Sequence, residues 1–434
     1  MKFKKVLSLA LAAVMAFSFA ACGGSADSKG DDKAADDKAE DSNSITVAAV
    51  ETAYGKAMWE SVAKAFTEET GIEVNLIVDK KLEDIITPDM KAGNYPDVIM
   101  RAVGSEQALT ETFVKDNNVL EMTDVLEMTV PGEDKKVGDK ILPGFTENSI
   151  TNPYGLFYNA ALFEEKGWTV PETWDQMWEL GDKAAAEGIA LFTYPTTGYF
   201  DAFFYALLHE SMGNEKFQEA LRYGEGIWDT PEAQRVFDII GKLATYTEKT
   251  TPANANDNDF QKNQQLILDN KALFVPNGNW LIGEMAEAPR AEGFEWGFTA
   301  LPAVEEGGER ASYTFFEQIW MPKEAPNAEA GKQFIAFMYS DKAAEIFAKE
   351  GGAVQPIEGM SSKLEGDAVT YYSIYDNGAV AVMDAFATTE PVEGLTTRSS
   401  FFDPINSLVT GEKTQEEWVE QFKADSDTFR ANLK

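Results

Sequence analysis

From residue 45 onward the sequence alternates between short apolar strands and amphipathic helices. Strands are predicted at residues 45–50 (ITVAAV), 73–78 (EVNLIV) and 96–100 (PDVIM). Apolar residues at helical spacing predict a helix after the first strand, at Met58, Trp59, Val62, Ala63 and Phe66. Strands that alternate with helices usually form a largely parallel sheet covered by helices on both faces. The sequence therefore predicts an α/β fold.

The same alternation returns after Gly155. Thr173 and Gln176 have the spacing of a capping box, and Thr230-Pro231 combines an N-cap residue with a first-turn proline. Further strands are predicted at residues 189–194, 271–276 and 296–302, and the segment 317–322 precedes helices capped by Asn327 and Ser340. No internal repeat of fixed period is found. The second half of the chain is therefore predicted to be α/β as well.

The N-terminus has the layout of a secretory signal peptide over residues 1–21. Three lysines precede the apolar run at residues 6–19, and small residues stand directly before Cys22. This ending resembles the lipobox of bacterial lipoproteins, in which the cysteine is diacylated and becomes the new N-terminus. The alternative is a signal peptide followed by an unrelated cysteine. Residues 22–44 are polar and lack large apolar side chains, so we predict a disordered tether.

The chain is strongly acidic, with 73 acidic and 37 basic residues and a formal net charge of −36. The electrostatic field of such a negatively charged protein repels nucleic acid, so no nucleic-acid partner is expected. With one cysteine and one histidine, His209, the chain can form neither an internal disulfide nor a metal site of the thiolate or imidazole type. We predict no metal and no cofactor.

Motifs of catalysis are not found in the sequence. It contains no Gly-x-Ser-x-Gly elbow, no phosphate-binding glycine loop and no metalloprotease helix. A glycoside hydrolase needs only a pair of carboxylates, but no pair stands out among the acids. We therefore predict a protein that is not an enzyme.

Aromatic residues stand in loops that follow predicted strands. Trp280 follows Asn279 in the VPNGNWL segment, and Tyr199, Phe200 and Asp201 follow the strand at residues 189–194. Ligands of open α/β sheets lie outside the carboxyl ends of the strands. A sugar needs a flat aromatic surface together with carboxylates and amides for its hydroxyl groups. These loops can supply both, although core packing is the alternative for each aromatic residue.

Several segments in fixed order resemble a known family. They are GNYPDVIM (93–100), LFYNAALFEEKGWTVPETWDQMW (156–178), NGNWLIGEM (277–285), and MPKEAPNAEAGKQFIAFMYSDKAAEIFAKEGG (321–352) followed by VQP. Together with the lipobox they resemble the extracellular solute-binding family 1, the sugar-binding lipoproteins of ABC importers. The resemblance covers nearly everything after Ile45. The segment GIALFTYPTTGYFDAF (188–203) is most similar to members that bind N-acetylglucosamine and diacetylchitobiose.

The resemblance implies a two-lobed periplasmic-binding-protein-like fold, with a mainly parallel sheet in each lobe and a hinge between them. Lobe one would hold residues 45–150 and 298–350, and lobe two residues 151–297 and 351–434. A sugar or short oligosaccharide would bind in the interlobe cleft and stabilise the closed form. The protein would be a monomer, lipid-anchored on the outer face of the cell membrane, that delivers the sugar to the permease subunits of an ABC transporter.

The resemblance also implies a set of ligand-binding residues. In lobe one they are Glu51, Tyr54, Arg101 and Glu106; in lobe two they are Tyr199, Phe200, Asp201, Asn279 and Trp280. Further candidates are Phe315, Phe316 and Glu317 near a crossing between lobes, and Arg398 and Phe401 in the C-terminal part. Plain solvent exposure is the alternative for the charged members.

One departure from the family pattern lies before Leu156. Members normally have a strand resembling Asp-Gly-Lys-x-Tyr-x-Leu-Pro ahead of the Leu-Phe-Tyr-Asn strand, whereas here NSITNPYG (148–155) runs directly into it. We interpret this as a missing strand, whose loss would expose a sheet edge and weaken the wall of the cleft.

Two rival functions remain open at this stage. A lipoprotein glycoside hydrolase would use a carboxylate pair in the same cleft, and a binder of peptides or polyamines would favour acidic walls over a stacking tryptophan. A thermal-shift screen of ligands separates these functions.

The lipobox generates the first testable prediction. Cys22→Ala removes the only acylation site, so the protein should move from the membrane fraction to the medium. Fractionation followed by immunoblotting measures this, with wild type as the control. Membrane association of the variant equal to that of wild type would contradict the prediction.

Overall fold

The structure is a computed structural model that describes residues 43–51, 55–102, 118–142 and 149–434. The predicted signal peptide, Cys22 and nearly all of the tether lie outside these residues. Residues Asn43–Lys434 form one compact unit.

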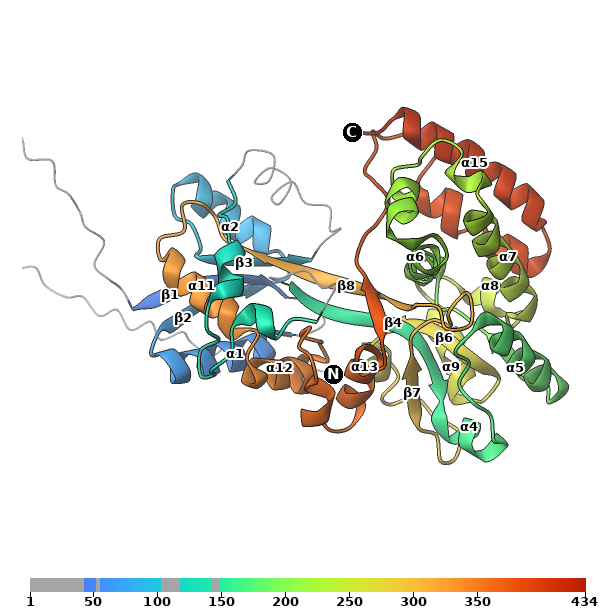
Figure 1. The fold of residues 1–434 in the computed structure, drawn as a ribbon, viewed down its shortest axis with the longest axis horizontal. Coiled ribbons are helices and arrows are strands. Elements are labelled where there is room, and N and C mark those ends of the chain that lie inside the picture. Colours follow the sequence, from blue (N-terminus) through green and yellow to red (C-terminus); the bar gives the residue numbers. More distant parts are fainter. Residues whose placement is uncertain (1–42, 52–54, 103–117, 143–148) are drawn as a thin grey trace, which may run out of the picture. The chain divides into compact units, whose positions relative to one another are not determined.

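Strands and helices alternate along the described chain (Figure 1). The strands are β1 (Ser44–Val50), β2 (Glu73–Asp79), β3 (Val98–Ala102), β4 (Ser149–Asn159), β5 (Ala190–Phe192), β6 (Ala272–Gly278), β7 (Trp296–Thr299), β8 (Arg310–Trp320) and β9 (Ala379–Val382). The helices are α1 (Gly55–Thr70), α2 (Leu82–Lys91), α4 (Ala160–Lys166), α5 (Trp174–Ala186), α6 (Thr197–Leu221), α7 (Pro231–Tyr246), α8 (Thr251–Asn254), α9 (Phe260–Leu268), α10 (Leu281–Glu284), α11 (Ala328–Phe337), α12 (Asp341–Ile346), α13 (Asp367–Asp376), α14 (Ile405–Thr410) and α15 (Gln415–Ala431). Short 3-10 or π turns lie at Thr123–Glu127, Val137–Asp139, Ile227–Asp229, Phe347–Gly351, Met360–Lys363 and Arg398–Phe402.

The helix starts follow the sequence signals closely. The Thr230 side chain accepts a hydrogen bond from the N–H of Ala233, with Pro231 in the first turn, as predicted. Thr173 accepts from the N–H of Gln176, but the Gln176 side chain accepts from Glu172 rather than from Thr173. Thr173 therefore caps the start of α5 as predicted. In the second bond of the capping box, the Gln176 side chain accepts from the N–H of Glu172, one residue before the predicted donor.

The described strands pair in the order β2-β1-β3-β8-β4-β6-β5, with β7 on β4 and β9 on β8. The pairs β1–β2, β1–β3 and β5–β6 are parallel, as the alternation of strands and helices predicts. By contrast, β4 and β8 run antiparallel to each other, and β8 is antiparallel to β3. The parallel parts of the sheet are thus joined through an antiparallel pair.

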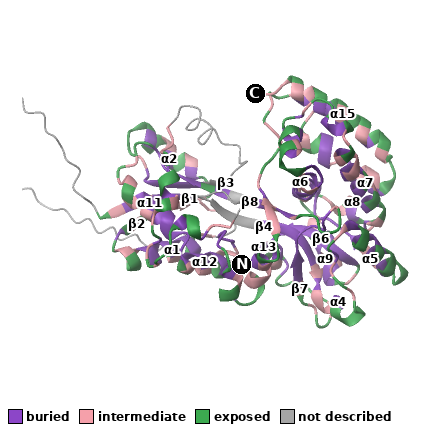
Figure 2. Ribbon diagram, viewed as in Figure 1, coloured by how far each residue is buried: buried purple, intermediate pink, exposed green. Residues whose placement is uncertain are grey.

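Buried side chains form two clusters. Figure 2 shows buried residues along the strands and on parts of the helices that cover them. The first cluster includes Trp59 and Phe66 of α1, with Phe334 of α11 in edge contact with Phe66. The second cluster includes Phe203 of α6 and Phe422 of α15. The predicted helical stripe of α1 is buried in the first cluster, which confirms that helix.

The boundaries between the two predicted lobes stay a prediction. Side chains from residues 353–375 pack in the first cluster, and so do Phe157 of β4 and Phe298 of β7. The first cluster therefore continues along the face of the sheet on both sides of the crossing strands.

The interpretation of a missing strand before Leu156 is wrong. Residues 149–153 of β4 pair with residues 314–318 of β8, and residues 154–157 of the same strand pair with β6. Residues 149–155, interpreted from the sequence as the remnant of a missing strand, therefore form the first part of the long strand β4. The family pattern misled because it led us to expect a separate strand ahead of Leu156, whereas here the preceding residues, including Pro153 opposite Thr314, pair within β4 itself.

The second prediction concerns Gly155, at the centre of β4. A Cβ atom there would lie 2.5 Å from the carbonyl oxygen of Thr299 and 2.8 Å from the Phe298 ring. Gly155→Ala should therefore lower the free energy of unfolding by about 1–3 kcal/mol, the typical cost of overpacking. Urea unfolding measures it, with Gly283→Ala as the control because a Cβ at Gly283 has nothing within 4 Å. Equal stability of the two variants would contradict the prediction.

Candidate functional site

The end of β6 places Trp280 against the edge of the sheet. All seven residues of β6 are buried, and the chain leaves the strand at Gly278 before α10 begins. A Cβ atom at Gly278 would overlap carbons of the Trp280 ring, so the indole lies directly over this glycine. A side chain at position 278 would force the ring elsewhere, and the glycine therefore determines where the indole can lie.

Trp280 belongs to a group of half-buried aromatic side chains. Its ring centroid lies 6.1 Å from that of Tyr199 in α6 and 5.5 Å from that of Phe315 in β8. The indole N–H donates to the Tyr199 hydroxyl at 3.2 Å. The Tyr154 hydroxyl of β4 donates to the carbonyl oxygen of Tyr199. The two predicted aromatic candidates, Tyr199 and Trp280, are thus brought together and held by hydrogen bonds.

Asp201 lies two residues after Tyr199 in α6 and is half-buried near tyrosine side chains. Burial raises its pKa to about 7, while the N–H of Ala202 and the charge of Arg398 act in the opposite direction. The carboxyl group in turn contributes to the raised pKa of Tyr154 and Tyr313. Arg398 is exposed, and its guanidinium lies 3.4 Å from both Asp403 and the Thr197 hydroxyl. Asp201 and Arg398 therefore form the charged margin of the aromatic group.

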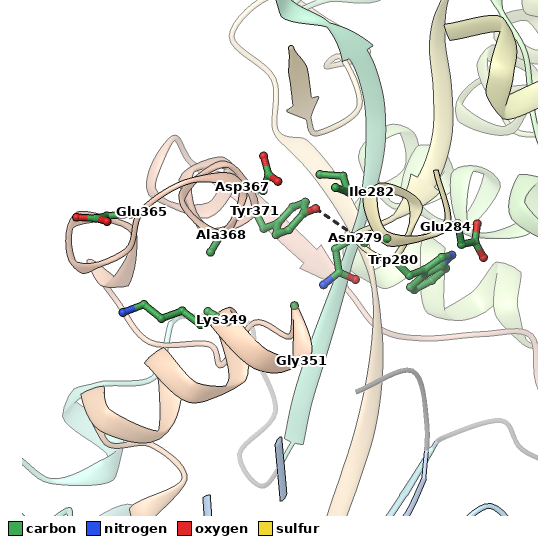
Figure 3. A pocket seen from close by; sticks show the side chains of 13 residues that line it. Asn279, Trp280, Ile282, Glu284, Lys349, Gly351, Glu365, Asp367, Ala368 and Tyr371 are labelled. Carbon is green, nitrogen blue, oxygen red and sulfur yellow. Dashed lines mark hydrogen bonds between the residues drawn. The ribbon is translucent and has the colours of Figure 1, made fainter. Parts of the chain in front are cut away.

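A cavity of about 850 Å³ adjoins the turn between β6 and α10 (Figure 3). Asn279, Trp280 and Glu284 line it on one side, and residues 348–352 and 365–371 line it on the other. The Tyr371 hydroxyl donates to the carbonyl oxygen of Asn279 at 3.1 Å. Asn279 is 7% exposed, and its side chain points toward Gly351. The cavity has the size of small-molecule pockets in proteins.

The predicted residues of lobe one are only partly described. Glu51 is half-buried directly after β1, where its N–H donates to the carbonyl oxygen of Asp79. Arg101 lies in β3 with its backbone paired to Gln318, and Phe316 and Glu317 lie in β8, where Glu317 is buried. Tyr54 and Glu106 lie outside the described residues, as do the side chains of Arg101 and Phe316. The structure therefore leaves the lobe-one set as a prediction.

Two predicted residues are fully buried in the second cluster. Phe200 is 0% exposed and stacks on Phe203, because it faces inward from the first turn of α6. Phe401 is also 0% exposed and stacks on Phe422 with ring centroids 4.0 Å apart. Both are part of the second cluster, so neither presents a face to a ligand in this structure.

Tyr313, Tyr371 and, less directly, Tyr205 lie at the site but are not among the sequence candidates. Tyr313 stacks on Tyr205 and contacts Phe315 two residues further along β8. Tyr313 and Phe315 are two residues apart in β8 and so share one face, but no strand is predicted over residues 310–316, so the shared face is not predicted either. Tyr371 lies in a helix without a marked stripe, and no local signal identifies it.

Neither metal coordination nor a membrane span is found in the described part of the chain. No group of three or more His, Cys, Asp or Glu side chains among residues 43–434, apart from the gaps, is placed to hold a metal ion. Within the same residues, each helix is too short or too polar to cross a bilayer.

Comparisons with known proteins identify the family and the fold. The family described as "Bacterial extracellular solute-binding protein" matches residues 61–370. The "Diacetylchitobiose binding protein NgcE" of Streptomyces coelicolor is 31% identical over 64% of this chain and 61% of the relative, so the alignment spans less than two thirds of its length. A "Maltooligosaccharide ABC transporter solute-binding lipoprotein" of Streptococcus pneumoniae is 24% identical over 94% of this chain and 93% of the relative.

Among solved structures, the apo form of RafE from Streptococcus pneumoniae matches with a TM-score of 0.66 and 19% identity, covering 91% of this chain and 100% of that one. These comparisons confirm the predicted two-lobed α/β fold and the predicted family resemblance. The matching family is one of solute-binding proteins, so the prediction of a protein that is not an enzyme is confirmed.

The third prediction concerns Asp201 and pH. Its pKa of about 7 lies above the usual 3.8, so the folded protein keeps a proton that the unfolded chain releases between about pH 4 and 7. The free energy of unfolding therefore falls as the pH rises through this window. The side chain of the Asp201→Asn variant carries no charge at any of these pH values. The free energy of unfolding of this variant should therefore rise relative to that of wild type by about 3 kcal/mol between pH 5 and 8.

Urea unfolding at several pH values measures this difference. Asp257→Asn is the control, because Asp257 is exposed. Parallel pH profiles for wild type and Asp201→Asn would contradict the prediction.

Proposed function

The chain belongs to the bacterial extracellular solute-binding proteins, and from this membership we propose that it captures a carbohydrate for an ABC importer. The observation that carries the proposal is the pair of half-buried aromatic rings, Trp280 and Tyr199, at the carboxyl end of β6. An indole with one accessible face is the surface on which the C–H face of a pyranose ring packs.

The polar groups around the aromatic pair support a polyhydroxylated ligand. The Asn279 carboxamide lines the cavity, and Asp201, which is close enough to Arg398 to feel its charge, follows Tyr199 by two residues in α6. Amides and carboxylates pair with sugar hydroxyls, and a carboxamide can also pair with an N-acetyl group. A wall built only for peptides or polyamines would not require the aromatic pair, so the carbohydrate is the better-supported ligand.

The ligand class follows from the relatives. NgcE is named for binding diacetylchitobiose, and other relatives are named for binding maltooligosaccharides and galactooligosaccharides. We propose a sugar or short oligosaccharide for this chain, with N-acetylglucosamine-containing disaccharides as the first to be tested. The cavity of about 850 Å³ beside Trp280 has room for more than one sugar ring.

Partners and location are part of the same proposal. The protein would be anchored through Cys22 on the outer face of the cell membrane, and would hand the sugar to the membrane-embedded permease as a monomer. A lipoprotein relative from Streptococcus pneumoniae supports the anchor. The acidic surface, with a formal net charge of −36, is compatible with binding a neutral ligand rather than nucleic acid.

The fourth prediction tests the aromatic contact. Trp280→Ala should weaken sugar binding by about 1.5–4 kcal/mol, or roughly tenfold to several hundredfold, the range of a buried aromatic anchor. A thermal-shift screen of oligosaccharides, peptides and polyamines identifies the ligand, and calorimetric titration then gives the affinities.

Trp168→Ala is the matched control, because Trp168 is also half-buried but packs on Phe163 beyond α4. It should bind like wild type. If no carbohydrate raises the thermal midpoint of wild type while a peptide or amine does, the carbohydrate proposal is wrong.

A further inference from the structure

Tyr371 differs from the other side chains that line the cavity, because its hydroxyl group forms a hydrogen bond with the backbone of the turn that carries Trp280. It is 5% exposed in α13, and it donates to the carbonyl oxygen of Asn279 at 3.1 Å (Figure 3). The residue after this carbonyl is Trp280. The hydrogen bond therefore links a helix from the C-terminal part of the chain to the backbone of the aromatic turn.

The planarity of the peptide group makes this link mechanically direct. The carbonyl oxygen of Asn279 lies in one rigid plane with the nitrogen and Cα atoms of Trp280. A bond that fixes the oxygen therefore fixes the direction in which the Trp280 chain leaves the strand. The far end of the same side chain is held separately, by the bond from the indole N–H to Tyr199. Trp280 is thus restrained at its backbone and at its tip.

The Tyr371 ring is itself firmly placed. Its centroid lies 5.4 Å from that of Phe298 in β7 and 6.4 Å from that of Phe157 in β4, in edge-to-face geometry with both. The hydroxyl is therefore presented to Asn279 by a ring packed on two strands of the sheet. Its position depends on the core and not on a mobile surface loop.

We propose that Tyr371 is a positioning residue for the sugar contact of Trp280. It touches no ligand in this role and acts through the Asn279–Trp280 peptide. The inference rests on the proposed carbohydrate site, but the placement of the indole that it explains exists without ligand. A purely structural role, in which the tyrosine only fills the core, would require the ring and not the hydroxyl.

The adjacent residue of α13 provides a matched control. Tyr372 is also buried, at 2% exposed, and its hydroxyl accepts the N–H of Gln355 at 2.6 Å. Tyr371→Phe and Tyr372→Phe each delete one buried tyrosine hydroxyl from the same helix. Only the first deletes a bond to the turn that carries Trp280.

The first measurement needs no ligand. The chain has nine tryptophans, so the ¹⁵N-labelled protein gives up to nine indole N–H resonances, and the one lost in Trp280→Phe belongs to Trp280. This resonance should shift or broaden in Tyr371→Phe and remain in place in Tyr372→Phe. An unmoved Trp280 resonance in Tyr371→Phe overturns the proposal, whether or not the protein binds carbohydrate.

The second measurement uses the oligosaccharide found in the thermal-shift screen. Tyr371→Phe should weaken its binding about three- to tenfold, as expected for the loss of one hydrogen bond, and Tyr372→Phe less than about twofold. In the Trp280→Phe background the effect of Tyr371→Phe should fall below about twofold, because the two residues act as a unit. Equal losses in both backgrounds overturn the proposal. If wild type binds no carbohydrate, the proposed function fails, and the indole resonance alone decides the role of Tyr371.

Discussion

The antiparallel pairing of β4 with β8 is the interaction on which the rest of the structure depends. Residues 149–153 of β4 pair with β8, and the same strand then pairs with β6 and β7. In the other direction β8 pairs with β3 and, at its start, with β9. The two parallel sections of the sheet therefore share no direct parallel ladder and are joined through these two long strands. A bend or twist of this pair would move one section relative to the other, as hinge closure requires, and it would also rearrange the first cluster, which contains side chains from both sections.

The proposed ligand site lies where β4 and β8 meet the end of β6. Trp280 packs on Phe315 of β8, and Tyr154 of β4 supports the backbone of Tyr199. Both crossing strands thus contribute side chains directly behind the aromatic pair. A sugar that packs on Trp280 would also press on the residues through which the two sections are joined. This arrangement gives a physical route from ligand contact to a change in the relative position of the sections.

The sequence predicts the elements well where one pattern decides them. The alternation in β1 to β3 and the stripe of α1 are local signals, and the structure confirms both. The length of β4 cannot be read from its own residues. Pro153 and Gly155 are residues typical of turns, and the segment is a strand because it pairs with β8 and β6. Gly155 is required there by the carbonyl of Thr299 and the ring of Phe298, which lie more than 140 residues further along the chain. No local reading of the segment can include those neighbours.

Aromatic residues show the same limit within the site. Tyr199 and Phe200 are adjacent in sequence and read alike, but they point to different sides of α6: one keeps a half-buried ring beside Trp280, and the other is sealed against Phe203. Phe401 is similarly sealed by Phe422. Buried rings still support the site. Phe200, Phe203 and Phe204 hold α6 in the second cluster, and they therefore hold the end of the helix that carries Tyr199 and Asp201. An aromatic residue near a strand end therefore identifies the neighbourhood of a sugar site, while the direction of its side chain decides between contact and support. The direction of the side chain depends on which side of the helix faces the second cluster. Because that cluster is assembled from residues between Tyr154 and Phe429, the direction is determined only in the folded chain.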